Sequence, residues 1–128
     1  MKNRYLVDSD VLIDFLRGRP EAVEFLKLHF PNIHLSVISV AELYSGVREG
    51  GERRVLESAL NSCHIMEVSN AIAIMAGSFR QTFGKSHGVC LPDALIAATA
   101  KEYGMHLVTL NVKHFPMFEN VVAPYRKA

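Results

Sequence analysis

Short runs of β-forming residues alternate with helical runs along the whole chain, and this alternation constrains the fold more than any other feature. Two parallel strands need a crossover connection between them, and that connection is usually a helix. We expect strands at 5–7, 34–37, 64–68, 106–109 and 121–123, and helices at 11–16, 20–28, 39–47, 52–60, 69–83 and 92–103. The alternation predicts an α/β fold, with a central parallel sheet covered by helices on both faces.

Length and composition limit the class of protein. The 128 residues suit one hydrophobic core, so we expect a single domain over 1–128. Hydrophobic residues make up 49% of the chain, which excludes a disordered protein, and no apolar stretch approaches the roughly 20 residues of a membrane span. The two cysteines, Cys63 and Cys90, are too few for a disulfide framework, and we expect both to be buried as small hydrophobic residues. These features predict a cytoplasmic protein without a membrane partner.

The charge balance excludes one way of binding nucleic acid. The formal net charge is only +1, whereas a protein that holds nucleic acid by electrostatics alone is usually much more basic. Contact with nucleic acid would therefore be local or would depend on a metal ion.

Acidic and polar residues recur where the expected strands end or the next helices begin. Asp8 follows the first strand, Glu42 and Asp93 lie in the first turns of two helices, and the segment 109–111 ends the fourth strand. In open α/β sheets ligands bind beyond the carboxyl ends of the strands. We expect these side chains to meet at that edge.

Each acid also has an ordinary structural explanation. Asp8 suits a helix N-cap, and Glu42 would complete a capping box begun by Ser39 at the N-cap. Asp93 suits the positive end of its helix dipole. Asp10 lies in a first helical turn, where acids are common. We expect Asp14 to form a surface ion pair with Arg17, three residues later.

Convergence of the acids would favour a bound cation. Two like charges ~4 Å apart repel by on the order of 4 kcal/mol at an effective dielectric of 20. A site built from carboxylates, without histidine or cysteine ligands, suits Mg²⁺ or Mn²⁺ rather than zinc. Such ions activate a water molecule and stabilise the leaving oxygen of a phosphodiester.

Four blocks of the sequence, in order, resemble one known family. They are YLVDSDVLIDFLRG at 5–18, SVISVAELYSG at 36–46, LPDALIAATA at 91–100 and LVTLNVKHF at 107–115. Together they resemble PIN-domain proteins and, within that family, the VapC-type toxin ribonucleases. The resemblance implies a three-layer α/β/α fold and an Mg²⁺- or Mn²⁺-dependent endonuclease that cuts RNA.

The resemblance also implies roles for particular residues. Asp8, Glu42 and Asp93 correspond to the metal ligands, and Asn111 occupies the fourth catalytic position, where many members have Asp. The supporting positions are Thr109, Ser39 and Asp10. Arg17, Lys113 and His114 are weaker candidates for binding the RNA phosphates.

Partners follow from the same resemblance. VapC-type toxins are usually paired with a small antitoxin whose C-terminal segment lies across the active-site groove. The resemblance therefore implies an antitoxin partner, an RNA substrate, and a homodimer or a larger toxin–antitoxin assembly.

Two alternatives remain at this level, a phosphatase and a binding module, and a third signal is close to chance. Asp8-Ser9-Asp10 is also similar to the opening of haloacid-dehalogenase-like phosphatases, although the later acidic pair of that family is missing. Residues 83–86 hint weakly at a phosphate-binding loop, without its first glycine. A PIN-like module that binds without cutting is the second alternative, and Asn111 is the feature that favours it.

Overall fold

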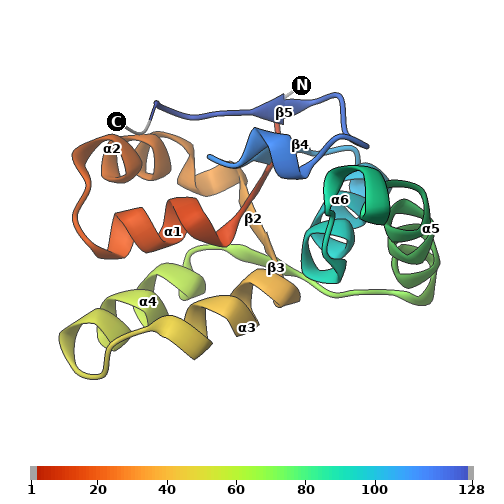
Figure 1. Ribbon diagram of the computed structural model, residues 1–128. Coiled ribbons are helices and arrows are strands. Elements are labelled where there is room, and N and C mark those ends of the chain that lie inside the picture. Colours follow the sequence, from red (N-terminus) through yellow and green to blue (C-terminus); the bar gives the residue numbers. More distant parts are fainter. Residues whose placement is uncertain (1–2, 127–128) are drawn as a thin grey trace.

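A parallel sheet of five strands forms the centre of the molecule (Figure 1). The computed structural model describes residues 3–126. The strands are β1 (Tyr5–Val7), β2 (Ile33–Ser36), β3 (His64–Met66), β4 (His106–Val108) and β5 (Val121–Val122). Their order is β3-β2-β1-β4-β5, and every neighbouring pair is parallel. The predicted parallel α/β sheet is confirmed, with β1 at its centre.

Helices cover both faces of this sheet. They are α1 (Ser9–Leu16), α2 (Pro20–His29), α3 (Val37–Gly46), α4 (Gly51–Asn61), α5 (Asn70–His87) and α6 (Leu91–Tyr103), with short 3₁₀ turns η1 (Phe30–Asn32) and η2 (Val112–His114). Helices α1 to α4 lie on one side of the sheet, and α5 and α6 lie on the other (Figure 1). The expected three-layer α/β/α fold is confirmed.

The alternation of side chains along the strands produces the two halves of the core. Val7 and Val108 pack into the buried cluster on the α1 to α4 side, whereas their neighbours Leu6 and Leu107 pack with Ile96 of α6 on the other side. All of these side chains are fully buried. Successive residues of a strand point to opposite faces, so two adjacent apolar residues serve both cores.

Helix α3 begins earlier than its sequence pattern indicates. Its N-cap is Ser36, whose Oγ accepts a hydrogen bond from the Ile38 N–H at 3.0 Å. The expected capping box from Ser39 to Glu42 is therefore wrong. Ser39 lies inside the helix, is fully buried, and its Oγ has no hydrogen-bond partner among the described residues. Both serines suit an N-cap locally, and the end of β2 at Ser36 determines which one is used.

Helix α5 continues where a loop over 84–88 was expected. Gly84 lies inside the helix, which runs on to His87 and ends at Gly88 in the left-handed conformation, with φ of 64°. That conformation suits glycine because a Cβ would crowd the following carbonyl. Residues 83–86 are therefore helical, and the weak hint of a phosphate-binding loop is wrong.

Asp14 does not lie on the surface as expected. Its side chain is buried, and Oδ2 accepts a hydrogen bond from the Tyr125 hydroxyl at 2.7 Å. The guanidinium of Arg19 lies over the Tyr125 ring, 5.2 Å from its centroid. The segment after β5 is thereby joined to α1 and the start of α2. Among residues 3–126, none of the helices combines the length and the apolar character needed to cross a membrane.

Removing the Tyr125 hydroxyl tests this connection. We expect Tyr125→Phe to lower the free energy of unfolding by about 1–2 kcal/mol, because a buried carboxylate loses one of its donors. Urea unfolding at neutral pH measures the change. The matched control is Tyr103→Phe, since Tyr103 is an exposed tyrosine on α6. Equal stability of wild type and Tyr125→Phe would contradict the role assigned to this hydrogen bond.

Candidate active site

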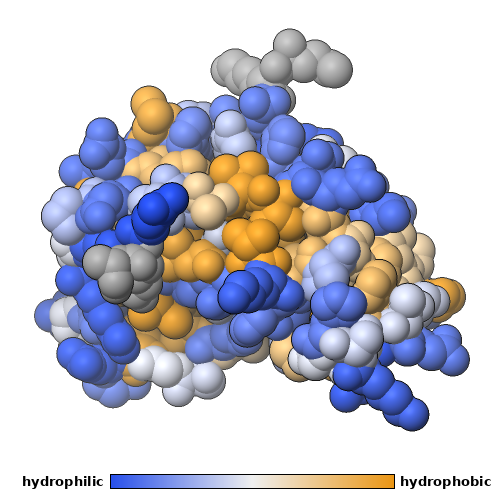
Figure 2. Space-filling view, turned by 45° about the horizontal axis from the view of Figure 1, so that its top comes forward, coloured by the Kyte–Doolittle hydropathy of each residue, from blue (hydrophilic) through white to orange (hydrophobic). Residues whose placement is uncertain are grey.

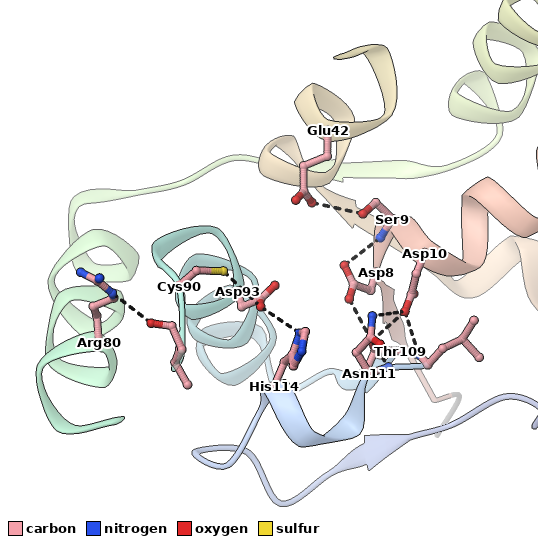
Figure 3. Close-up of polar contacts among 12 residues, drawn as sticks. Asp8, Ser9, Asp10, Glu42, Arg80, Cys90, Asp93, Thr109, Asn111 and His114 are labelled. Carbon is pink, nitrogen blue, oxygen red and sulfur yellow. Dashed lines mark hydrogen bonds and ion pairs between the residues drawn. The ribbon is translucent and has the colours of Figure 1, made fainter. Parts of the chain in front are cut away.

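The polar residues picked out by the sequence meet at the carboxyl edge of the sheet (Figure 3). Asp8 directly follows β1, and its backbone N–H donates to the Val108 carbonyl of β4 at 2.8 Å. This bond extends the pairing of the two central strands to the end of β1 and brings Asp8 next to Thr109. Glu42 approaches from α3 and Asp93 from the first turn of α6. Four separate segments thus contribute side chains to one place.

Asp8 is both a helix cap and the buried centre of the cluster. Oδ1 accepts from the Ser9 N–H at 2.8 Å, and Oδ2 accepts from the Thr109 hydroxyl at 2.8 Å. Only 6% of the residue is exposed. Burial raises the pKa of this carboxyl, the two hydrogen bonds partly oppose the rise, and nearby Asp93 adds to it. The cap and the site are therefore compatible, because each carboxylate oxygen has its own contact.

Asp10 fastens the start of α1 to the segment after β4. Its Oδ2 accepts from the Leu110 N–H and from Asn111 Nδ2, each at 3.0 Å. Its Oδ1 is buried without a hydrogen-bond partner among the described residues. Burial, reinforced by the charge of Asp8, raises the pKa of Asp10 to about 6.

Thr109 lies between the two aspartates. Its Oγ1 is 2.8 Å from Asp8 Oδ2 and 3.3 Å from Asp10 Oδ2. A hydroxyl has a single proton to donate, so the shorter contact takes it. The same oxygen accepts from the Asn111 N–H at 3.1 Å. Thr109 therefore orients Asp8 and also shapes the turn that carries Asn111.

Glu42 and Asp93 complete the group of acids. Glu42 Oε1 accepts from the Ser9 hydroxyl at 3.2 Å, and burial, together with Asp8 and Asp93, raises the pKa of Glu42. Asp93 Oδ2 accepts from Cys90 Sγ at 3.2 Å and lies 3.4 Å from His114 Nδ1. When protonated, His114 forms an ion pair with Asp93 that offsets part of the negative charge.

The remaining sequence candidates are more scattered. Arg17 and Glu42 line the same small hollow between α1 and α3. Lys113 is exposed in η2, beside His114. Ser39 makes none of the hydrogen bonds of the cluster, so the structure does not bring it into the site.

Sequence reasoning missed two residues of the cluster. Ser9 links Asp8 to Glu42, and the only sequence signal was its place between two aspartates. Cys90 was expected to be buried, but it is exposed as the N-cap of α6 and donates to Asp93. Its position three residues before Asp93 was the signal.

The donor set suits a hard cation in its chemistry. Asp8, Glu42 and Asp93 offer carboxylate oxygens, and the pKa values of Asp8 and Glu42 are raised partly by the neighbouring acids. Oxygen ligands of this kind are those that Mg²⁺ and Mn²⁺ prefer. As they stand, no three His, Cys, Asp or Glu side chains among the described residues are grouped tightly enough to hold an ion.

Comparison with known proteins decides the family. Residues 5–117 match the family model described as PIN domain. The chain belongs to the PIN domain family.

Similar proteins come from toxin–antitoxin systems or carry ribonuclease names. Over 123 residues this PIN domain is 42% identical to "Ribonuclease VapC10" of Mycobacterium tuberculosis, covering 94% of this chain and 92% of that protein. "Ribonuclease VapC19" of the same organism is 37% identical over 124 residues, covering 94% and 98%. A structure described as "Toxin-antitoxin complex from Klebsiella pneumoniae" superposes with a TM-score of 0.83 at 32% identity, covering 96% and 99%. The family match decides against the phosphatase alternative.

The raised pKa of Asp10 gives this PIN domain a testable pH dependence. Its folded pKa of about 6 lies above the ordinary value of 3.8, so the folded state binds this proton more tightly than the unfolded chain does. This carboxyl therefore makes the stability fall as pH rises from about 4 to about 6. We expect Asp10→Asn to lose less stability than wild type over that range in metal-free buffer, as measured by thermal melts.

Glu119→Gln is the control, because it removes an exposed carboxylate elsewhere on the surface. Melting curves of wild type and Asp10→Asn that shift in parallel with pH would contradict the assignment.

Proposed function

We propose that this PIN domain is the toxin of a toxin–antitoxin pair, an endoribonuclease that hydrolyses phosphodiester bonds in RNA with the help of Mg²⁺ or Mn²⁺. The observation that carries the proposal is the meeting of Asp8, Glu42 and Asp93 at the carboxyl edge of the sheet (Figure 3). The ribonuclease names of relatives up to 42% identical support it.

Asp8, Glu42 and Asp93 would hold the cation, which requires their carboxylates to lie closer together than they do here. The residues around them orient these carboxylates. When bound, the cation supplies charge neutralisation and an activated water molecule at the scissile phosphate. Thr109 and Ser9 fix the two oxygens of Asp8, and the Ser9 hydroxyl also holds Glu42. Hydrolysis would leave 5′-phosphate and 3′-hydroxyl ends.

Basic side chains and a histidine beside the acids would bind the flanking phosphates. His114 reaches Asp93 at 3.4 Å, and Lys113 precedes it in the exposed turn η2. On the other side of the cluster, Arg17 lines the hollow next to Glu42. RNA lying across the edge of the sheet would meet these side chains, of which Lys113 and Arg17 are cations, on both sides of the acidic centre. They explain how a chain with a net charge of only +1 would hold RNA locally.

A small antitoxin would cover the same edge. The hollow beside Glu42 is lined by the apolar side chains of Ile13, Leu16 and Val47 together with Arg17, so it offers both apolar and charged contacts to a peptide. The likeness to a toxin–antitoxin complex supports such a partner. We extend the proposal to a homodimer, or a larger assembly with the antitoxin, acting in the cytoplasm.

Cleavage of a mixed RNA panel by purified protein tests the function. We expect cutting with Mg²⁺ or Mn²⁺ and none with EDTA. Asp8→Asn and Asp93→Asn should each lower the rate at least about 100-fold, because even the outer partners of metal ligands are worth about 10–100-fold. Asparagine is as good an N-cap as aspartate, so Asp8→Asn keeps the cap of α1, while it removes the charge and replaces the acceptor that faces Thr109 with a donor.

Two controls make this test decisive. Thermal melts must show that both variants are folded, and Glu119→Gln must cut like wild type. If the folded Asp8→Asn variant cuts RNA at the wild-type rate, Asp8 is only a cap. If wild-type protein binds Mn²⁺ by calorimetry but cuts no RNA in the panel, the chain is a binding module and the proposed activity is wrong.

A further inference from the structure

Asp10 and Asn111 form a side-chain pair that the proposed chemistry does not yet use. Asn111 Nδ2 donates to Asp10 Oδ2 at 3.0 Å, across 101 positions of the sequence. The same oxygen accepts from the Leu110 N–H at 3.0 Å. Figure 3 shows the two side chains facing each other beside Asp8. The pair therefore belongs to the edge of the site, although only Asn111 is exposed.

The contact with Asp10 determines the orientation of the Asn111 side-chain amide. An ionised carboxylate can only accept hydrogen bonds, so the NH₂ end of the amide must face Asp10. The two ends of a planar amide diverge, and the carbonyl oxygen is consequently directed away from Asp10. The Asn111 backbone is held as well, because its N–H donates to Thr109 Oγ1 at 3.1 Å. Both the backbone and the amide of Asn111 are thus constrained from the side of β1 and α1.

We propose that Asp10 is a positioning residue whose negative charge requires a neutral side chain, such as that of Asn111, opposite it. Its carboxylate orients the Asn111 amide so that the neutral carbonyl oxygen, and not the NH₂ group, is presented at the edge of the site. The identity of residue 111 then follows from the carboxylate opposite it, because a second carboxylate there would place two like charges in contact. What the carbonyl oxygen binds, a cation or its water, rests on the proposed function, whereas the pairing itself does not.

If Asp10 and Asn111 form such a pair, the change in stability caused by a substitution at position 111 depends on the residue at position 10. Asn111→Asp brings a second carboxylate to within hydrogen-bond distance of Asp10, and the two repel. In an Asp10→Asn background the same change no longer brings two carboxylates together, and the total charge is that of wild type. One atom at position 10 then cannot both donate to residue 111 and accept from the Leu110 N–H, as Oδ2 serves both in wild type. The double variant should therefore recover the part of the loss that comes from charge repulsion.

Thermal melts in EDTA at about pH 7.5 test this without any activity. We expect Asn111→Asp to lower the melting temperature by about 4 °C or more in the wild-type background, and by clearly less in the Asp10→Asn background, where the charge repulsion is absent. Asn120→Asp, which adds the same charge at an exposed position just before β5, should have equal effects in both backgrounds. An equal effect of Asn111→Asp in both backgrounds would overturn the inference.

A spectroscopic measurement tests the orientation directly. In a ¹⁵N-edited spectrum, the Asn111 side-chain NH₂ pair is identified by its absence from Asn111→Asp. We expect this pair to exchange slowly with water in wild type and at least about tenfold faster in Asp10→Ala. If Asp10→Ala fails to fold, the thermal melts of Asn111→Asp in the wild-type and Asp10→Asn backgrounds still test the pairing. Unchanged exchange in folded Asp10→Ala would contradict the pairing.

Kinetics then separate positioning from mere stability. We expect Asp10→Ala to lower kcat for RNA cleavage and the affinity for Mn²⁺ by about tenfold, with KM changed less than about twofold. The double variant Asp10→Asn, Asn111→Asp should melt at a higher temperature than Asn111→Asp alone. If neither wild type nor any variant cuts RNA, the proposed function is wrong. The thermal melts and the exchange rates would still test the pairing of Asp10 with Asn111.

Discussion

The hydrogen bond from the Thr109 hydroxyl to Asp8 joins the ends of the two central strands at the edge of the sheet where the acidic side chains gather. It measures 2.8 Å and is buried, and it links residues 101 positions apart in the sequence. Because Thr109 also accepts the Asn111 N–H, one hydroxyl sets the direction of a carboxylate and the path of the following turn. Leu110 and Asn111, which both donate to Asp10, lie in that turn, so the local geometry of the edge rests on this contact.

Gathering acids at one edge opposes folding, and the structure shows how the opposition is reduced. Burial and mutual repulsion raise the pKa values of Asp8, Asp10 and Glu42. Hydrogen bonds from backbone N–H groups and from the Ser9 and Thr109 hydroxyls partly lower these pKa values again. His114 faces Asp93. Without a cation, this repulsion lowers the stability of the folded chain at neutral pH. A bound cation would remove the repulsion, so the arrangement favours cation binding at this edge.

Local sequence patterns predicted the elements well and their ends less well. Both Ser36 and Ser39 are suitable N-caps, and the hydrogen-bonded end of β2 selected Ser36. Gly84 suggested a loop because glycine disfavours helix, but contacts between α5 and α6 carry the helix past it. Asp14 had the spacing of a surface ion pair with Arg17, yet Tyr125, from the far end of the chain, covers it. In each case a tertiary contact outweighed a local preference of about 1 kcal/mol or less.

The sequence by itself determined the succession of strands and helices along the chain, the parallel sheet, and the placement of Asp8 at a strand end and of Glu42 and Asp93 near helix starts. These follow from apolar periodicity and from local cap chemistry. Only the tertiary structure decided that Asp10 faces Asn111, that Ser9 connects Asp8 with Glu42, and that Ser39 stays outside the cluster. Such pairings depend on strand register and on the angle at which each helix packs. Those are properties of the whole core, and no segment of the sequence specifies them alone.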